Sequence, residues 1–197
     1  VRKDKNLLRQ QLGAPEDADI ISFVGRLDQQ KGIVPLISAF AALDATTKPV
    51  LLWMIGDGPL RDEITSSVET HHLQGRVVLW GQQPYVADFL LASDLFVLPS
   101  LYEAMPITLI EALAAGLPCV ATDVGDNALI IQDGVNGLIV PPDDPPALQN
   151  ATARLWFDTY PRPGAPGGMF TGDFAIDNFF WLHRLHDEFF EWHRVTD

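Results

Sequence analysis

Cysteine is nearly absent from this sequence: Cys119 is the one cysteine among 197 residues. No disulfide can therefore form within the chain, which excludes a disulfide-stabilised scaffold and is compatible with a reducing compartment. Cys119 lies in the apolar run 117–121, so we expect it to be a small buried hydrophobic side chain. No apolar run approaches the roughly 18 residues of a membrane-spanning helix. Residues 1–6 have no apolar core and no initiator methionine, so we expect no signal peptide and a piece of a longer protein.

Positive charge is also scarce, with 13 Lys and Arg against 26 Asp and Glu and a net charge of −13. Such a chain has too few cations to neutralise phosphates along a whole face, which argues against nonspecific binding to nucleic acid. One small anion in a locally basic pocket stays compatible with this charge. With 47% hydrophobic and 20% charged residues, the chain can bury a full core, and its length suits one or two domains.

Six short apolar runs are rich in β-branched and aromatic residues. They do not alternate with polar residues, which is typical of strands covered on both faces of a parallel sheet. The runs are residues 20–25, 50–56, 77–81, 95–98, 119–122 and 137–140. We therefore predict a parallel sheet of about six strands.

Helical periods lie between these runs. One has the i, i+3, i+4, i+7 spacing of a single buried face, at Ile33, Leu36, Ile37 and Phe40. Three further helices are expected to begin at Pro59, Pro84 and Pro106. The alternation of strand and helix predicts a doubly wound α/β domain over residues 1–160, and such domains bind ligands beyond the carboxyl ends of their strands.

The last part of the chain differs in composition. Residues 161–168 are rich in proline and glycine and predict a linker, and residues 169–197 predict an aromatic helix. One face of that helix carries Leu182, Leu185, Phe189 and Trp192. The helix either packs on the same domain or presents an exposed apolar face to a partner domain. Three histidines in this segment lack an acid at metal-ligand spacing, so we predict no metal site at His183, His186 or His193.

Two glycine-rich turns follow the first two predicted strands. The turn from Gly25 to Gly32 contains Arg26 and Lys31, which can reach the same anion, and its amides and the helix N-terminus face the crevice. A diphosphate suits this turn, although a solvated loop with two surface cations is equally compatible with it. In the next turn, Gly56 and Gly58 allow close backbone approach, and Asp57 is most simply a cap.

The segment from Glu103 to Glu111 is the most specific. Glu103 precedes the helix that Pro106 opens, and Glu111 lies more than a turn inside it. We expect a buried stripe of Ile107, Ile110 and Ala114, and we expect Glu111 to face the crevice from another face, which it shares with Thr108 and Ala115. An ionised glutamate only accepts hydrogen bonds, so Glu111 suits the two hydroxyls of a ribose and Glu103 a sugar ring. The simpler alternative is two surface glutamates near a positive helix end.

These motifs together resemble those of retaining GT-B glycosyltransferases of the group 1, or family 4, type. Glu103 and Glu111 have the spacing of the E-x(7)-E motif in that family. The segments 23–32, 55–60, 92–100, 114–118 and 133–142 are similar to its other motifs, in the same order. The resemblance covers roughly residues 6–155. It implies that the chain is the C-terminal, Rossmann-like half of a GT-B fold.

The resemblance also implies roles for single residues. Arg26, Lys31 and Glu103 would be the catalytic residues: the two cations would hold the donor diphosphate, and Glu103 the transferred sugar. Glu111 would bind the ribose. The remaining donor-binding positions would be Gly25, Gly56, Gly81, Gln82, Ala104, Met105, Pro106, Ile107 and Leu109. Backbone near Gly81 and Gln82 would meet the base, Leu109 would line the ribose pocket, and no metal or other cofactor would be needed.

Some features depart from the family pattern. Ala104 replaces the usual glycine after the first glutamate, and the segment 125–129 lacks a second glycine and a glutamate. The N-terminal acceptor-binding domain of such enzymes is not in this sequence. We therefore expect a retaining hexosyltransferase domain that binds a nucleotide-diphosphate sugar but is inactive alone.

We expect a cytoplasmic protein, with any association with the membrane face made through the missing half. One alternative from another functional class is a non-catalytic nucleotide-binding or interaction module derived from this fold. A sugar-nucleotide epimerase of GT-B type matches the motifs less well.

Overall fold

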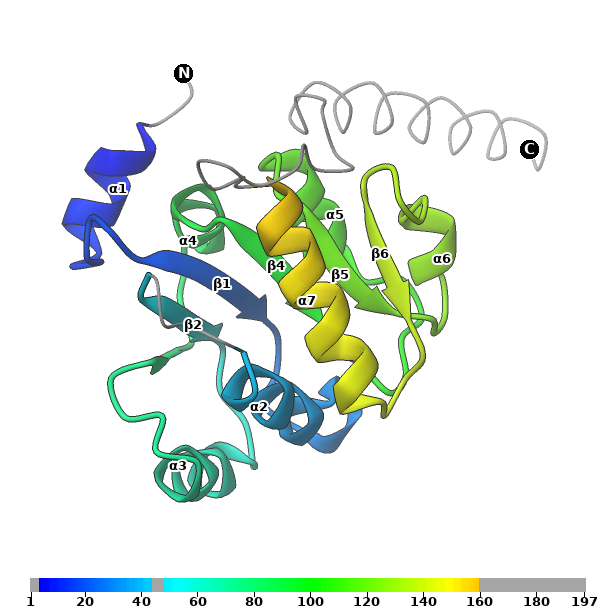
Figure 1. Ribbon diagram of the computed structural model, residues 1–197, viewed down its shortest axis with the longest axis horizontal. Helices are drawn as coiled ribbons and strands as arrows, with labels where there is room; N and C mark the ends of the chain where they lie inside the picture. Colours follow the sequence, from blue (N-terminus) through cyan, green and yellow to red (C-terminus); the bar gives the residue numbers. More distant parts are fainter. Residues whose placement is uncertain (1–3, 44–47, 160–197) are drawn as a thin grey trace.

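The computed structural model describes residues 4–43 and 48–159, and of residues 156–159 it describes only the backbone. Six parallel strands form one sheet in the order β3-β2-β1-β4-β5-β6 (Figure 1). The strands are β1 (Asp19–Val24), β2 (Val50–Ile55), β3 (Val77–Gly81), β4 (Leu95–Leu98), β5 (Cys119–Thr122) and β6 (Gly137–Val140). Each predicted apolar run is a strand, so the predicted doubly wound parallel sheet is confirmed.

Helices cover both faces of this sheet. The helices are α1 (Lys5–Gln11), α2 (Ile33–Ala41), α3 (Arg61–Thr70), α4 (Val86–Ala92), α5 (Ile107–Ala114), α6 (Asn127–Ile130) and α7 (Pro145–Thr159), with a 3-10 turn, η1 (Gln29–Lys31), before α2. Helices α2, α3 and α7 pack together on one face, and α1, α4, α5 and α6 lie on the other (Figure 1). The alternation of strand and helix produces this arrangement, because each helix carries the chain back to the amino ends of the strands, so that the next strand runs parallel to the others.

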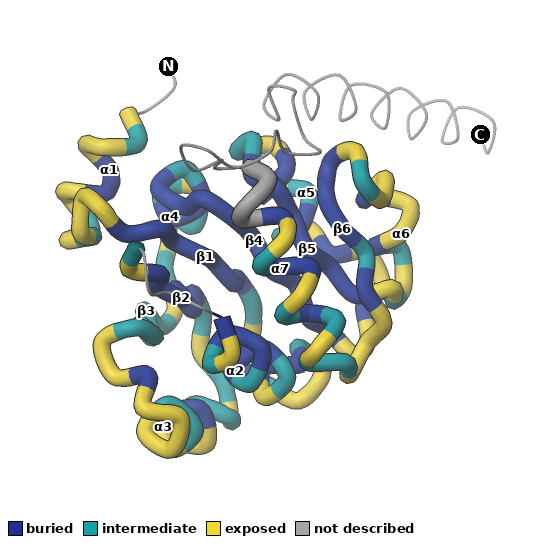
Figure 2. The backbone as a smooth tube through the Cα atoms, viewed as in Figure 1, coloured by how far each residue is buried: buried dark blue, intermediate teal, exposed yellow. Residues whose placement is uncertain are grey.

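The core lies between the central strands and both helical layers. Residues of β1, β2, β4 and β5 are buried throughout, whereas the edge strand β3 is half-buried (Figure 2). Helix α4 is fixed to β2 and β3 by a group of edge-to-face rings, in which Trp80 lies 5.4 Å from Trp53 and 4.9 Å from Phe89 between ring centroids. Such pairs add to the free energy of burial of the rings. Cys119 is fully buried, as its apolar surroundings predict.

For two helices the structure differs from the sequence analysis. The stripe predicted to be buried on α5 was Ile107, Ile110 and Ala114, but Ile107 is 65% exposed, and Leu109, Ala112 and Leu113 form the buried face. Almost every position of this short helix is apolar, so periodicity alone did not determine which face meets the sheet. Helix α7 was not predicted, although its buried positions Leu148, Ala151 and Leu155 have helical spacing. The predicted linker 161–168 and aromatic helix 169–197, including His183, His186 and His193, lie outside the described residues.

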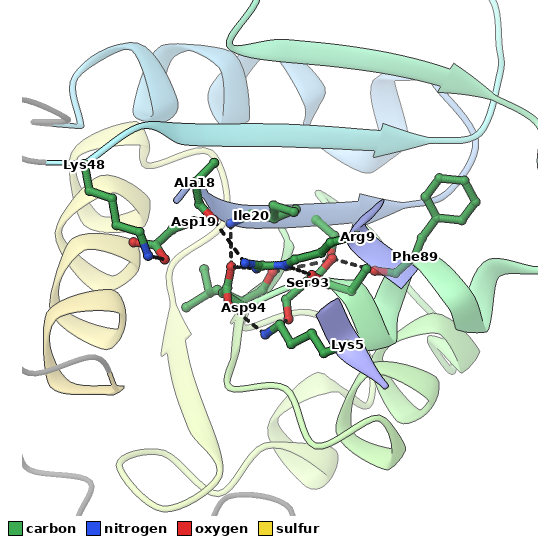
Figure 3. Close-up of polar contacts among 12 residues, drawn as sticks. Lys5, Arg9, Ala18, Asp19, Ile20, Lys48, Phe89, Ser93 and Asp94 are labelled. Atoms are coloured by element: carbon green, nitrogen blue, oxygen red, sulfur yellow. Dashed lines mark hydrogen bonds and ion pairs between the residues drawn. The ribbon is translucent and has the colours of Figure 1, made fainter. Parts of the chain in front are cut away.

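A buried ion cluster fastens α1 to the sheet at the amino ends of β1 and β4 (Figure 3). The Asp94 carboxylate accepts hydrogen bonds from Arg9, from Lys5 Nζ at 2.7 Å and from the Ile20 amide at 2.7 Å. Arg9 also donates to the carbonyls of Ala92 and Ala18 at 2.9 and 3.2 Å. Burial lowers the pKa of Lys5, and the charge of Asp94 partly opposes that shift. This cluster lies at the edge opposite the carboxyl ends, so its role is to hold the fold together.

Candidate functional site

The strand order reverses between β1 and β4, which are neighbours in the sheet although β2 and β3 lie between them along the chain. The loops that leave these two strands run in opposite directions, so a crevice opens between them at the carboxyl edge. Residues 25–32 follow β1 and residues 99–106 follow β4. Both segments that the sequence singled out therefore meet at the switch point of the fold.

The turns after β1 and β2 are packed tightly against each other. The amide of Gly25 donates to the carbonyl of Ile55 at 3.0 Å, and the amide of Leu27 donates to the carbonyl of Asp57 at 3.0 Å. Gly56 has φ +138°, and a Cβ atom there would lie 1.9 Å from the Gly25 carbonyl oxygen. Only glycine permits this approach, which explains the predicted requirement for glycine in the second turn.

A cleft of about 430 Å³ opens above these turns. It is lined by Val24, Gly25, Arg26, Ile55, Gly56, Asp57, Gln82, Gln83 and Val86. Four of the predicted donor-binding residues therefore line one cleft: Gly25, Arg26, Gly56 and Gln82. The Arg26 side chain is 71% exposed and lies 3.7 Å from the Asp28 carboxylate, which leaves its guanidinium accessible to an anion. Gly81, with φ +68°, ends β3 directly before Gln82.

Glu103 and Lys31 meet directly at the switch point. Lys31 Nζ lies 2.5 Å from Oε1 of Glu103, and the hydroxyl of Ser100 donates to the same oxygen at 2.7 Å. Glu103 is only 7% exposed, and the Lys31 side chain is 19% exposed. Burying a carboxylate this deeply costs free energy unless such partners hold it. The structure thus joins the predicted sugar-binding acid to one of the predicted phosphate-binding cations.

The loop between Glu103 and α5 is exposed and rests on the next loop of the sheet. Ala104, Met105 and Ile107 are exposed, whereas Pro106, which precedes α5, is buried. The Asp126 amide donates to the Ala104 carbonyl at 3.1 Å. The amides of this loop and of the first turn of α5 lie at the carboxyl edge, where a helix N-terminus favours an anion.

Glu111 and Leu109 lie apart from the cleft that contains Arg26. Glu111 is exposed and borders a separate hollow of about 300 Å³ between α4 and α5. That hollow is otherwise apolar, with Ala87, Leu90, Leu91, Ala114 and Ala115 around it. Leu109 is fully buried at 0% exposure, so its side chain offers no surface to a ribose.

Sequence reasoning missed Ser100, which is fully buried beside Glu103. It also missed Gln83, which lines the cleft and donates to the Trp80 carbonyl at 2.8 Å. The signal for Ser100 was its position three residues before Glu103 and two residues after the end of β4. Within residues 4–43 and 48–159, no group of three His, Cys, Asp or Glu side chains is arranged to hold a metal ion.

The model of the family Glycosyl transferases group 1 matches residues 4–161. The chain belongs to this family. It is 39% identical over 161 residues to TuaC, a protein of Bacillus subtilis named for teichuronic acid biosynthesis, and the match covers 81% of this chain and 38% of TuaC. It is 32% identical over 153 residues to the alpha-D-kanosaminyltransferase of Streptomyces kanamyceticus, covering 77% of this chain and 39% of that enzyme.

Among solved structures, the chain is similar to HepE of Anabaena in complex with UDP. The TM-score is 0.76 at 26% identity, over 88% of this chain and 46% of HepE. The family member described here therefore has the fold of about half of a GT-B glycosyltransferase, as the motifs predicted. The chain spans less than half the length of these relatives. Among the described residues, every helix is too short or too polar to span a membrane.

Proposed function

We propose that this chain binds a nucleotide-diphosphate sugar and supplies the donor half of a retaining hexosyltransferase. The observation that carries the proposal is the meeting of Lys31 and Glu103 at the switch point, beside the cleft that Arg26 lines. A cation and a buried acid at that place match the two ends of a sugar diphosphate, one anionic and one rich in hydroxyls. HepE of Anabaena, which is 27% identical to this chain, has been solved with UDP-glucose.

Each end of the donor has matching groups on this chain. Arg26 and Lys31 would neutralise the diphosphate, Arg26 through a forked guanidinium and Lys31 as a point charge. Amides between Ala104 and Ile107, at the N-terminus of α5, would add further donors. Glu103 would accept hydrogen bonds from the sugar. Backbone near Gly81 and Gln82 would meet the base.

Glu111 would bind the ribose from its place beside the hollow between α4 and α5. Val86 lines the cleft that contains Arg26, and the next residue, Ala87, lines this hollow, so both spaces border the start of α4.

The reaction would be transfer of the sugar with retention of configuration. The bond between the anomeric carbon and the diphosphate oxygen breaks, and a bond from the acceptor oxygen to the same face of that carbon forms. The departing phosphate takes the proton of the acceptor hydroxyl, while Arg26 and Lys31 stabilise the charge that develops on it. An acceptor-binding domain outside this sequence would complete the crevice, so we expect the chain alone to bind donor but transfer little.

Calorimetric titration of the 197-residue chain with UDP and UDP-glucose tests this proposal. Lys31→Ala should weaken binding by about 1–3 kcal/mol, since it removes a charge-assisted contact to phosphate. Lys48→Ala is a matched control, because Lys48 pairs with Asp19 at the opposite edge of the sheet. Thermal unfolding of each variant checks that the fold is intact.

Two results would contradict the proposal. One is the absence of binding by wild type with either nucleotide at millimolar concentration. The other is a Lys31→Ala variant that is folded and binds as tightly as wild type. The first result would favour the alternative of a non-catalytic interaction module.

A further inference from the structure

The buried carboxylate of Glu103 is held through only one of its two oxygens. Oε1 accepts from Lys31 Nζ at 2.5 Å and from Ser100 Oγ at 2.7 Å. Within the part of the chain that the structure describes, no group donates a hydrogen bond to Oε2, and Oε2 keeps some contact with solvent. One oxygen is therefore fixed by the protein, and the other stays open to a ligand.

Ser100 can fix Oε1 because Ser100 is itself immobile. It is fully buried, and its carbonyl accepts from the hydroxyl of Thr122 on β5 at 2.6 Å. The next residue, Leu101, donates its amide to the Gln30 carbonyl at 2.7 Å, which ties this loop to the turn that carries Lys31. The hydroxyl of Ser100 thus projects from a segment that both neighbouring loops hold in place.

A glutamate carboxylate needs such a partner to keep one orientation. The last torsion of the glutamate side chain has a broad, roughly two-fold profile, so the plane of the carboxylate is set by hydrogen bonds rather than by the side chain. Lys31 alone is a point charge on a flexible stem and imposes little direction. Ser100 has a single proton to donate and a fixed position, so its bond defines where Oε2 points.

We propose that Ser100 is a positioning residue, which orients the Glu103 carboxylate so that Oε2 faces a hydroxyl of the donor sugar. This inference rests on the proposed function, because it assigns that sugar to Glu103. It adds that the preference for a sugar nucleotide over the bare nucleotide depends on a buried serine that touches neither ligand. A group held in advance loses less free energy on binding than one that must be ordered by the ligand.

The distinguishing readout is the ratio of the affinities for UDP-glucose and for UDP. UDP has no sugar to meet Glu103, so its affinity should change by less than about twofold in Ser100→Ala. The affinity for UDP-glucose should fall, and the ratio with it, by about three- to tenfold, the effect of one hydrogen bond. Calorimetric titration of both ligands against the 197-residue wild type and the variant measures this ratio.

Ser22→Ala is the matched control. Ser22 is also fully buried on a central strand, and its hydroxyl donates to the Leu95 carbonyl at 3.3 Å without contact to Glu103. It should leave the ratio unchanged. A ratio that stays at the wild-type value in Ser100→Ala, or that falls equally in Ser22→Ala, would overturn the inference. So would an equal loss of affinity for UDP and UDP-glucose, since that indicates a structural role.

Failure of the proposed function is recognised separately, because wild type would then bind neither ligand. In that case crystal structures of wild type and Ser100→Ala decide the question of orientation. A carboxylate of Glu103 that turns or becomes spread over several orientations in the variant supports the role of Ser100, and an unchanged plane refutes it.

Discussion

Replacing Gly32 by alanine should be one of the most destabilising single-methyl changes in this protein. Gly32 joins η1 to α2 with φ +61°, a left-handed conformation that costs an alanine about 1–2 kcal/mol. A Cβ atom there would also lie 1.9 Å from the Pro99 carbonyl oxygen, at the end of β4. That atom is backbone, so the two loops must move apart, at a cost of about 1–3 kcal/mol by analogy with overpacked cores. We expect Gly32→Ala to lower the free energy of unfolding by about 2–5 kcal/mol.

Gly13 is the matched control for this experiment. Its φ of +66° is nearly the same, but no atom lies within 4 Å of the position its Cβ would occupy. Gly13→Ala therefore incurs only the conformational cost of about 1–2 kcal/mol. Urea unfolding of the wild type and both variants, followed by circular dichroism, gives the two free energies.

The difference between the two variants isolates the contact between the loops after β1 and β4. We expect it to be at least about 1 kcal/mol, with Gly32→Ala the less stable. Equal destabilisation would show that these loops do not approach as closely as described. It would also undermine the geometry on which the meeting of Lys31 and Glu103 depends.

The ion cluster and the buried thiol give two further predictions. Asp94→Asn should lower the free energy of unfolding by about 3–5 kcal/mol, because it leaves Arg9 and Lys5 without their counter-charge. Asp57→Asn, which changes an exposed pair, should lower it by less than about 1 kcal/mol. Similar values for the two variants in urea unfolding would argue against the stabilising role of the cluster. Burial raises the pKa of the Cys119 thiol well above its ordinary 9.0. The unfolded chain then loses its thiol proton first as the pH rises above about 9, so stability falls there. Urea unfolding at about pH 8 and about pH 10 should show a larger loss for wild type than for Cys119→Ala, and an equal loss would contradict this.

The strands were predictable because a parallel sheet covered on both faces requires continuous apolar runs, and the chain has six of them. Features that depend on tertiary contacts could be predicted less well from the sequence. Helix α5 has apolar residues on two faces, and only packing against β4 and β5 selects Leu109, Ala112 and Leu113 for burial. The same choice places Leu109 in the core and so removes its side chain from any ribose pocket.

At the site, the sequence indicated which residue types matter but not how they pair. Arg26, Lys31, Glu103 and Gln82 follow strands, so their position at the carboxyl edge could be inferred from the alternation of elements. The contact between Lys31 and Glu103 depends on β1 and β4 being neighbours in the sheet, which spacing along the chain does not reveal. Asp94 was recognised only as part of a motif, because its partners Arg9 and Lys5 lie more than 80 positions away.

The placement of β1 beside β4 also bears on how the protein folds. Six residue pairs join β1 to β2, but only two join β1 to β4, so the sheet consists of two sequence-continuous halves with a short seam. Lys31 and Glu103 come from opposite sides of that seam and are separated by 72 positions. Their contact therefore forms only after the halves have docked, and it should be among the first lost if the halves separate. A ligand that contacts both residues would stabilise the docked arrangement of the two halves. The slow hydrogen exchange of amides in β1 and β4 should therefore become slower when the ligand binds.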